Sequence, residues 1–147
     1  MKAISPVIAT VIIVAVAIAI SIAVALWLTG IVGGFTTVEN LQITYAFAEK
    51  RYDHALASEY WAIVLRVENK GTVTATIDEI FINGVPIGQV PRASTDPPIG
   101  GGISINTGGT RNITVRLPVD NFRSGQQVEI KLHTASGKEY PKMVTLP

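Results

Sequence analysis

The chain contains no cysteine, so disulfide bonds and thiolate chemistry are excluded, and core packing must supply the stability. Charge is also scarce: charged residues make up 16% of the 147 residues, against about 25% in an average soluble domain. No Asp, Glu, Lys or Arg occurs between Lys2 and Glu39. Lys2 is one of 12 basic residues, so the other 11 balance the 11 acidic ones. The sequence shows no basic patch of the kind that binds nucleic acid, and we expect no nucleic-acid partner.

The uncharged stretch is filled by an apolar run from Val7 to Leu28, in which Thr10 and Ser21 are the conspicuous polar residues. As a helix, this run would be about 33 Å long, close to the ~30 Å hydrocarbon thickness of a bilayer. Both hydroxyls can bond to carbonyls one turn earlier in such a helix. Ser5 is suited to the N-cap and Pro6 to the first turn, so we expect the helix to begin there.

Glycines follow the apolar run. We predict that the helix fades at Thr29–Gly30 and the Gly33–Gly34 pair, and that Gly30, Gly33 and Gly34 form a hinge. The predicted domains are therefore a helix and hinge over residues 4–34 and a globular domain over residues 35–147.

The predicted helix is apolar on every side, so it must be buried in lipid or in other protein. Small residues at four-residue spacing, which let helix backbones approach closely, form two adjacent stripes: Ala15, Ala19 and Ala23, and Ala17, Ser21 and Ala25. Two other interpretations are a lipid-facing anchor and a secretory signal removed after residues 23–25. Against the signal, the run exceeds the about 7–15 residues of a usual signal core.

The segment from Lys2 to Thr10, KAISPVIAT, followed at once by the apolar run, resembles the start of archaeal type IV pilins and adhesion-filament subunits. The resemblance covers roughly residues 2–30. It implies a prepilin peptidase that cuts between Ala3 and Ile4, leaving a leader of residues 1–3 with Lys2 before the cut. Ile8 stands where bacterial relatives carry a glutamate, as suits the archaeal branch.

After the hinge, the hydrophobic period changes to two, which is typical of half-buried strands. About seven short strands at roughly ten-residue spacing predict an antiparallel, immunoglobulin-like β-sandwich and an α+β fold class. The segments with strand character are 41–47, 61–67, 73–82, 85–87, 103–105, 113–117, 128–132 and 140–146. In the first of them, the alternation predicts Tyr45 and Phe47 on the buried face with Leu41 and Ile43.

Single residues and pairs in the later strands predict a bulge, a turn, an edge strand and a loop. The buried parity changes near Asp78–Glu79, which predicts a bulge or break there. Asn83–Gly84 predicts a tight hairpin turn, and Pro86 predicts an edge strand because proline donates no ladder hydrogen bond. Residues 91–102, rich in proline, glycine and serine, are expected to form a loop.

No residue pattern indicates an enzyme, a cofactor or a metal site. His54 and His133 have no second ligand pair at a recognisable spacing, so we expect solvated or capping roles. Gly100–Gly102 lacks the Lys-Ser/Thr pair of a phosphate-binding loop, and Asp78–Glu79 is expected to be solvated. Asn112 begins an N-glycosylation sequon, Asn-Ile-Thr, on a predicted outward parity.

These observations favour a structural subunit of an extracellular adhesion filament. Its expected partners are identical subunits, the membrane before assembly, and the prepilin peptidase and pilus assembly machinery that the resemblance implies. Two alternatives remain open: a membrane-anchored surface adhesin, and a minor pilin that does not build the filament shaft.

Overall fold

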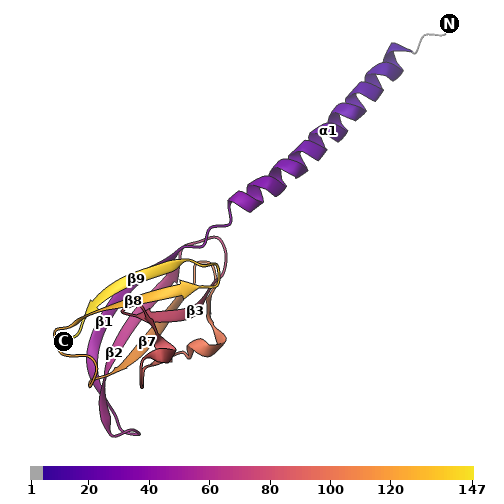
Figure 1. Ribbon diagram of the computed structural model, residues 1–147. Helices are drawn as coiled ribbons and strands as arrows, with labels where there is room; N and C mark the ends of the chain where they lie inside the picture. Colours follow the sequence, from indigo (N-terminus) through magenta and orange to yellow (C-terminus); the bar gives the residue numbers. More distant parts are fainter. Residues whose placement is uncertain (1–4) are drawn as a thin grey trace. The chain divides into compact units, whose positions relative to one another are not determined.

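In the computed structural model, which describes residues 5–147, the chain divides after Thr37 into two compact units (Figure 1). The first unit is a single long helix, and the second, called the β-unit, contains two antiparallel sheets. The predicted fold class, a long N-terminal apolar helix followed by antiparallel β-sheets, is confirmed.

Helix α1 runs from Pro6 to Phe35, with Ser5 as its N-cap residue. Pro6 lies in the first turn as predicted, where its missing N–H has no helical partner to lose. The hydroxyls of Thr10 and Ser21 each donate to a carbonyl oxygen one turn earlier at 2.6 Å. The polar groups of the apolar run are therefore satisfied within the helix itself.

The helix continues past the glycines that we expected to end it. The amide of Thr36 still donates to the carbonyl of Val32 at 3.0 Å. The predicted end at residues 29–30 is therefore wrong, because a helical glycine costs only about 1 kcal/mol relative to alanine and no proline follows until Pro86. The three glycines assigned to the hinge all lie inside α1: Gly30, Gly33 and Gly34.

The first sheet, sheet A, has four antiparallel strands in the order β1-β2-β7-β5. Their bounds are β1 Leu41–Asp53, β2 Ser58–Asn69, β7 Thr110–Pro118 and β5 Ser94–Asp96. The two longest strands, β1 and β2, pair from Leu41↔Asn69 at one end to Asp53↔Ser58 at the other. Sheet A thus begins at Leu41, and the chain reverses direction after Asp53 at the other end of β1.

The second sheet, sheet B, has the order β4-β3-β8-β9, and β6 also pairs with β3. Its strands are β3 Ala75–Ile82, β4 Val85–Pro86, β6 Ile103–Ile105, β8 Gln127–Thr134 and β9 Glu139–Thr145. Figure 1 shows β8 and β9 in one layer and β1, β2 and β7 in the other.

The hydrophobic core lies between the two sheets and takes side chains from both. The predicted alternation is confirmed in β2, β7 and β8, whose inward residues are buried: Trp61, Ile63, Leu65, Val67, Ile113, Val115, Leu117, Val128, Ile130 and Leu132. The one polar group of Trp61, its indole N–H, donates to the carbonyl of Phe122 at 2.8 Å. Apolar packing of this kind explains how a chain without disulfides holds a small domain together.

Two bulges change which face a strand buries. In β3 the register shifts between Ile77 and Glu79, as predicted, so that Ile77 and Ile80 are both buried. In β1 an unpredicted shift lies between Ile43 and Tyr45. The predicted burial of Tyr45 and Phe47 is therefore wrong: Tyr45 is 55% exposed, Phe47 is half-buried beside it, and alanines 46 and 48 pack on the core instead.

The Asn83–Gly84 turn joins β3 to β4, with φ of 50° and 81° at the two residues. Two positive φ values are what a type I′ hairpin turn requires. Pro86 ends β4, an edge strand of sheet B, as predicted.

The predicted loop over residues 91–102 contains two short elements. Strand β5 pairs with β7, and a 3-10 helix, η2, spans Ile99–Gly101; another, η1, spans Ile87–Gln89. With β5, the described part of the chain has nine strands instead of about seven. A three-residue strand is too short to show a period of two, so the sequence gives no sign of β5.

Candidate functional site

The surface of α1 is the main candidate site, because it is apolar on every side and has no covering within the chain. None of its 30 residues is buried, and Ala9 is the single residue that is even half-buried. The helix contains no charged residue. By length and composition it is the one helix among the described residues that could cross a membrane, with a mean hydropathy of 3.1 in its most apolar window. A membrane anchor and a signal sequence both pass this test. The length and composition of α1 therefore suit either role.

The small residues predicted to mediate packing all lie on α1 and are exposed: Ala15, Ala17, Ala19, Ser21, Ala23 and Ala25. A shallow hollow opens on the helix surface where Ala15 is flanked by larger side chains, and it is lined by Thr10, Val11, Val14, Ala15 and Ile18. Such a hollow allows a second backbone to come close. The residues of the predicted leader cut, Lys2, Ala3 and Ile4, lie outside the described residues.

The β-unit begins with a segment that is hydrogen-bonded to the turn after β2. The amide of Thr72 donates to the carbonyl of Val38 at 2.7 Å, and the amide of Lys70 donates to the carbonyl of Asn40 at 2.8 Å. At Gly71, between them, a Cβ would lie 2.7 Å from the Asn40 nitrogen, closer than real Cβ atoms approach. The turn therefore needs glycine at this position to receive the segment.

Glu39 joins the same segment to sheet B, a role that the sequence did not predict. Its side chain is 9% exposed, and Oε1 accepts from the hydroxyls of Thr134 at 2.7 Å and Tyr140 at 3.2 Å. The ammonium group of Lys138 donates to the Glu39 carbonyl at 2.7 Å. Burial, and to a lesser extent the Glu39 carboxylate, raise the pKa of the Tyr140 phenol above 10.0. A lone glutamate after an uncharged run gives no sequence signal of burial, so this contact could not be predicted.

Asn112 lies on β7 with its side chain exposed, while Ile113 beside it is fully buried. The predicted outward parity of Asn112 is confirmed. Its neighbour across the ladder is Arg66 of β2, which is also exposed. The Asn112 side chain is therefore exposed to solvent in the folded domain.

The histidines lie apart from each other and have ordinary neighbours. His133 Nδ1 is 2.6 Å from Asp78 Oδ1, and the His54 ring packs edge-on against Tyr52. Within residues 5–147 no group of three or more His, Asp or Glu side chains is placed to hold a metal ion.

No protein-family model matches the chain, and no curated protein matches it either.

Proposed function

We propose that this protein is the structural subunit of an extracellular filament of the archaeal type IV pilus kind, polymerised through α1 and serving surface adhesion. The observation that carries the proposal is a 30-residue helix without charged residues, whose side chains are exposed on every face of the helix. The resemblance of residues 2–30 to archaeal pilins supports the same proposal.

Such a helix is not stable in water. Burying one side chain of the size of valine, leucine or isoleucine is worth about 1.5–3 kcal/mol, and α1 exposes more than a dozen of them. The helix therefore needs lipid or other protein around it both before and after assembly. Lipid before assembly and sister helices afterwards offer similar apolar surroundings, so transfer from one to the other need not expose it to water.

The stripes of small residues favour sister helices as the final surroundings. Lipid tails adapt to any apolar surface, whereas close helix packing benefits from small side chains every fourth residue. Repeated contacts that do not close on themselves generate a helical fibre. No disulfide is needed to hold such a fibre, in keeping with a chain that has no cysteine.

The β-unit would then form the outer coat, since the charges from Glu39 onward all belong to it. Removal of a leader between Ala3 and Ile4 by a prepilin peptidase, and delivery by pilus assembly machinery, complete the proposal. Asn112 is the proposed attachment point for an N-linked glycan on this coat.

A charge at the middle of α1 tests the proposal. In A19D, an aspartate costs about 2.5–3.5 kcal/mol within an apolar helix in a membrane, and we expect assembly to fail while the β-unit keeps its near-ultraviolet circular dichroism. Q42D places the same charge on an exposed residue of β1 and should assemble normally. Normal yields of A19D filaments in electron micrographs would refute packing through α1.

The main rival is a membrane-anchored surface adhesin, which the hydropathy of α1 alone would equally suit. The triple variant A15L/A19L/A23L separates the two, because an anchor tolerates larger apolar residues and a close-packed bundle does not. The matched control V14L/I18L/I22L adds leucines at the same spacing without replacing a small residue. Loss of filaments in the first variant alone supports the bundle. A minor pilin would be recognised by its low abundance in purified filaments.

A further inference from the structure

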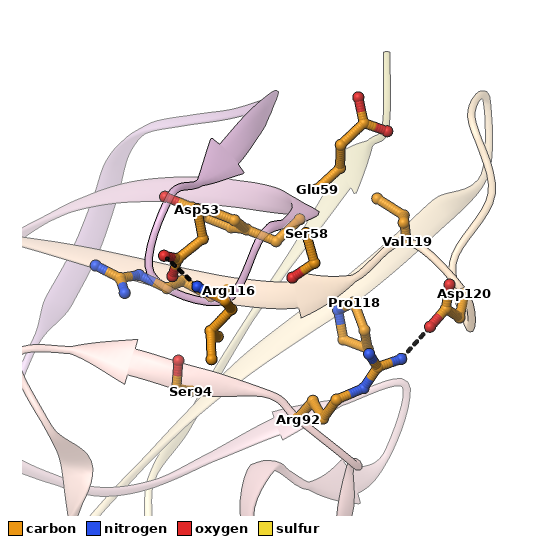
Figure 2. A pocket seen from close by; sticks show the side chains of 11 residues that line it. Asp53, Ser58, Glu59, Arg92, Ser94, Arg116, Pro118, Val119 and Asp120 are labelled. Atoms are coloured by element: carbon orange, nitrogen blue, oxygen red, sulfur yellow. Dashed lines mark hydrogen bonds and ion pairs between the residues drawn. The ribbon is translucent and has the colours of Figure 1, made fainter.

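The β-unit has a cavity of about 260 Å³ on the outer surface of sheet A (Figure 2). Its floor comes from three neighbouring strands: Tyr60 of β2 pairs with Pro118 of β7, and Ser94 of β5 pairs with Arg116 of β7. The β1–β2 turn and the loops around Arg92 and Asp120 form the walls. These residues come together from three separate parts of the chain, residues 53–60, 92–94 and 116–120.

The cavity lies at the end of sheet A farthest from the residue where the sheet begins. Strand β1 starts at Leu41 and has 13 residues, so its other end, Asp53, is about 40 Å away at ~3.3 Å per residue. Asp53 lines the cavity. A ligand bound there stays clear of the segment that follows α1.

Most charged groups of the cavity already have hydrogen-bond or ion-pair partners. Arg92 forms an ion pair with Asp120, as the dashed line in Figure 2 shows. Asp53 Oδ1 accepts from two backbone amides of the β1–β2 turn at 2.8 and 3.2 Å. Glu59 points away from the Arg92–Asp120 pair in Figure 2 and is bound to Lys50 at 2.5 Å. The cavity therefore offers no strong net charge to a ligand.

Arg116 is the exception, because part of its hydrogen-bonding capacity is unused. Its guanidinium lies over the Tyr60 ring, 5.5 Å from the centroid, and its nearest carboxylate oxygen, on Asp96, is 3.9 Å away. Its Nε is buried and finds no hydrogen-bond acceptor among the described residues. The side chain as a whole is 41% exposed, so a ligand oxygen can accept from its other guanidinium N–H groups.

Backbone strain is concentrated at the same place. Ala57 and Arg92 have φ of 49° and 59°, in a region that residues other than glycine, asparagine and aspartate rarely occupy. Ala57 belongs to the β1–β2 turn beside the cavity, and Arg92 lines it. Positions of this kind gather at ligand sites more often than elsewhere.

We infer that this cavity binds a single neutral sugar residue of a saccharide. Hydroxyl and ring oxygens would accept from the Arg116 guanidinium, and sugar hydroxyls would donate to the unused lone pairs of Asp53 and Asp120. The apolar face of the ring would lie against Pro118 and Val119. The volume is below the about 300–1,000 Å³ of pockets for drug-sized ligands, which suits one ring of a longer chain.

Other ligand classes fit less well. An inorganic anion or a cation would compete with ion pairs that the cavity already makes, and a purely apolar ligand would leave the Arg116 donor unmet and bury Asp53 and Asp120 against carbon. A neutral polyol avoids both costs. The inference rests on the proposed function only in so far as adhesion needs a ligand; the cavity itself does not depend on polymerisation.

The test uses the full-length chain in detergent micelles, applied to an array of immobilised neutral, sialylated and sulfated saccharides. We expect binding to neutral saccharides, with a Kd of about 1 mM for the free methyl glycoside by calorimetry. R116Q should weaken this binding at least tenfold. R66Q, which changes an exposed arginine outside the cavity on the same sheet, should bind as the wild type does.

S58F, which narrows the cavity from the β1–β2 turn, should also abolish binding, and unchanged thermal unfolding shows that either variant still folds. No binding to any neutral saccharide, binding to charged saccharides alone, or equal loss in R66Q and R116Q would overturn the inference. Filament formation is scored separately by electron microscopy. Filaments without sugar binding refute the cavity ligand alone, and sugar binding by a chain that never polymerises refutes the filament alone.

The saccharide has two possible sources, a foreign surface and a glycan on Asn112 of another copy of this chain. Assembled N112Q, which lacks the sequon, separates them. Equal sugar binding by N112Q and wild-type filaments supports a foreign source. Greater binding by N112Q filaments supports occupation of the cavity by a neighbour's glycan.

Discussion

Replacing Asn69 by alanine should destabilise the β-unit strongly, because its side chain satisfies three backbone groups in the interior. Asn69 is fully buried at the end of β2. Its Nδ2 donates to the carbonyls of Val73 at 2.8 Å and Ile105 at 2.9 Å, and its Oδ1 accepts from the amide of Gly71 at 2.9 Å. The side chain thus joins the turn after β2 to β6 of the other sheet.

The expected cost follows from these three bonds. A buried backbone group left without a partner costs about 1–3 kcal/mol, so three of them, with some relaxation and water entry, should lower the free energy of unfolding by about 3–5 kcal/mol. That is a large share of the about 5–15 kcal/mol of an ordinary domain. N69D keeps the acceptor for Gly71 but loses both donations and places a carboxylate against two carbonyls, so it should be at least as damaging.

Urea unfolding of the full chain in detergent, followed by the fluorescence of buried Trp61, measures the change. The matched control is N106A, since Asn106 is exposed and its side chain accepts one long hydrogen bond, at 3.4 Å, from Thr74. N106A should lie within about 0.5 kcal/mol of the wild type. The reasoning fails if N69A unfolds at the same urea concentration as N106A.

Three further predictions concern residues 38–40 and their partners in the β-unit, and Asn112. Because the pKa of Tyr140 is raised in the folded state, this group contributes stability below pH 10.0, and that stability is lost as the pH rises above this value. Y140F should therefore flatten the alkaline side of a plot of Tm against pH. An unchanged slope would contradict the raised pKa. G71A forces the segment at Val38 away from its turn and should cost about 1–3 kcal/mol or more in urea unfolding, while G88A, with open space around it, should be nearly neutral. Mass spectrometry of the native protein should find a glycan on the peptide with Asn112, absent in N112Q; an unmodified peptide contradicts this.

The features that the sequence predicted correctly are those with a local physical cause. The change of buried parity required an extra residue near Asp78, and the structure has its bulge there. The Asn83–Gly84 turn and the edge position of Pro86 follow from backbone dihedral preferences and a missing N–H, which do not depend on distant residues. The apolar run likewise determines α1 by composition alone.

The features that it missed depend on tertiary contacts. A bulge after Ile43 places Tyr45 outside, although the sequence alternation continues without a break across it. The burial of Glu39 depends on Thr134 and Tyr140, which follow it by 95 and 101 residues. The cavity on sheet A, too, is assembled from segments whose spacing in the sequence carries no pattern.

Electron cryomicroscopy of filaments sheared from cells that express this chain is the most direct test of the proposed assembly through α1. We expect a central bundle in which residues 6–35 of each copy are helical and surrounded by the same helix of other copies, with the β-units outside. Density in which these helices are surrounded by lipid alone, or filaments that do not contain the chain, would contradict assembly through α1.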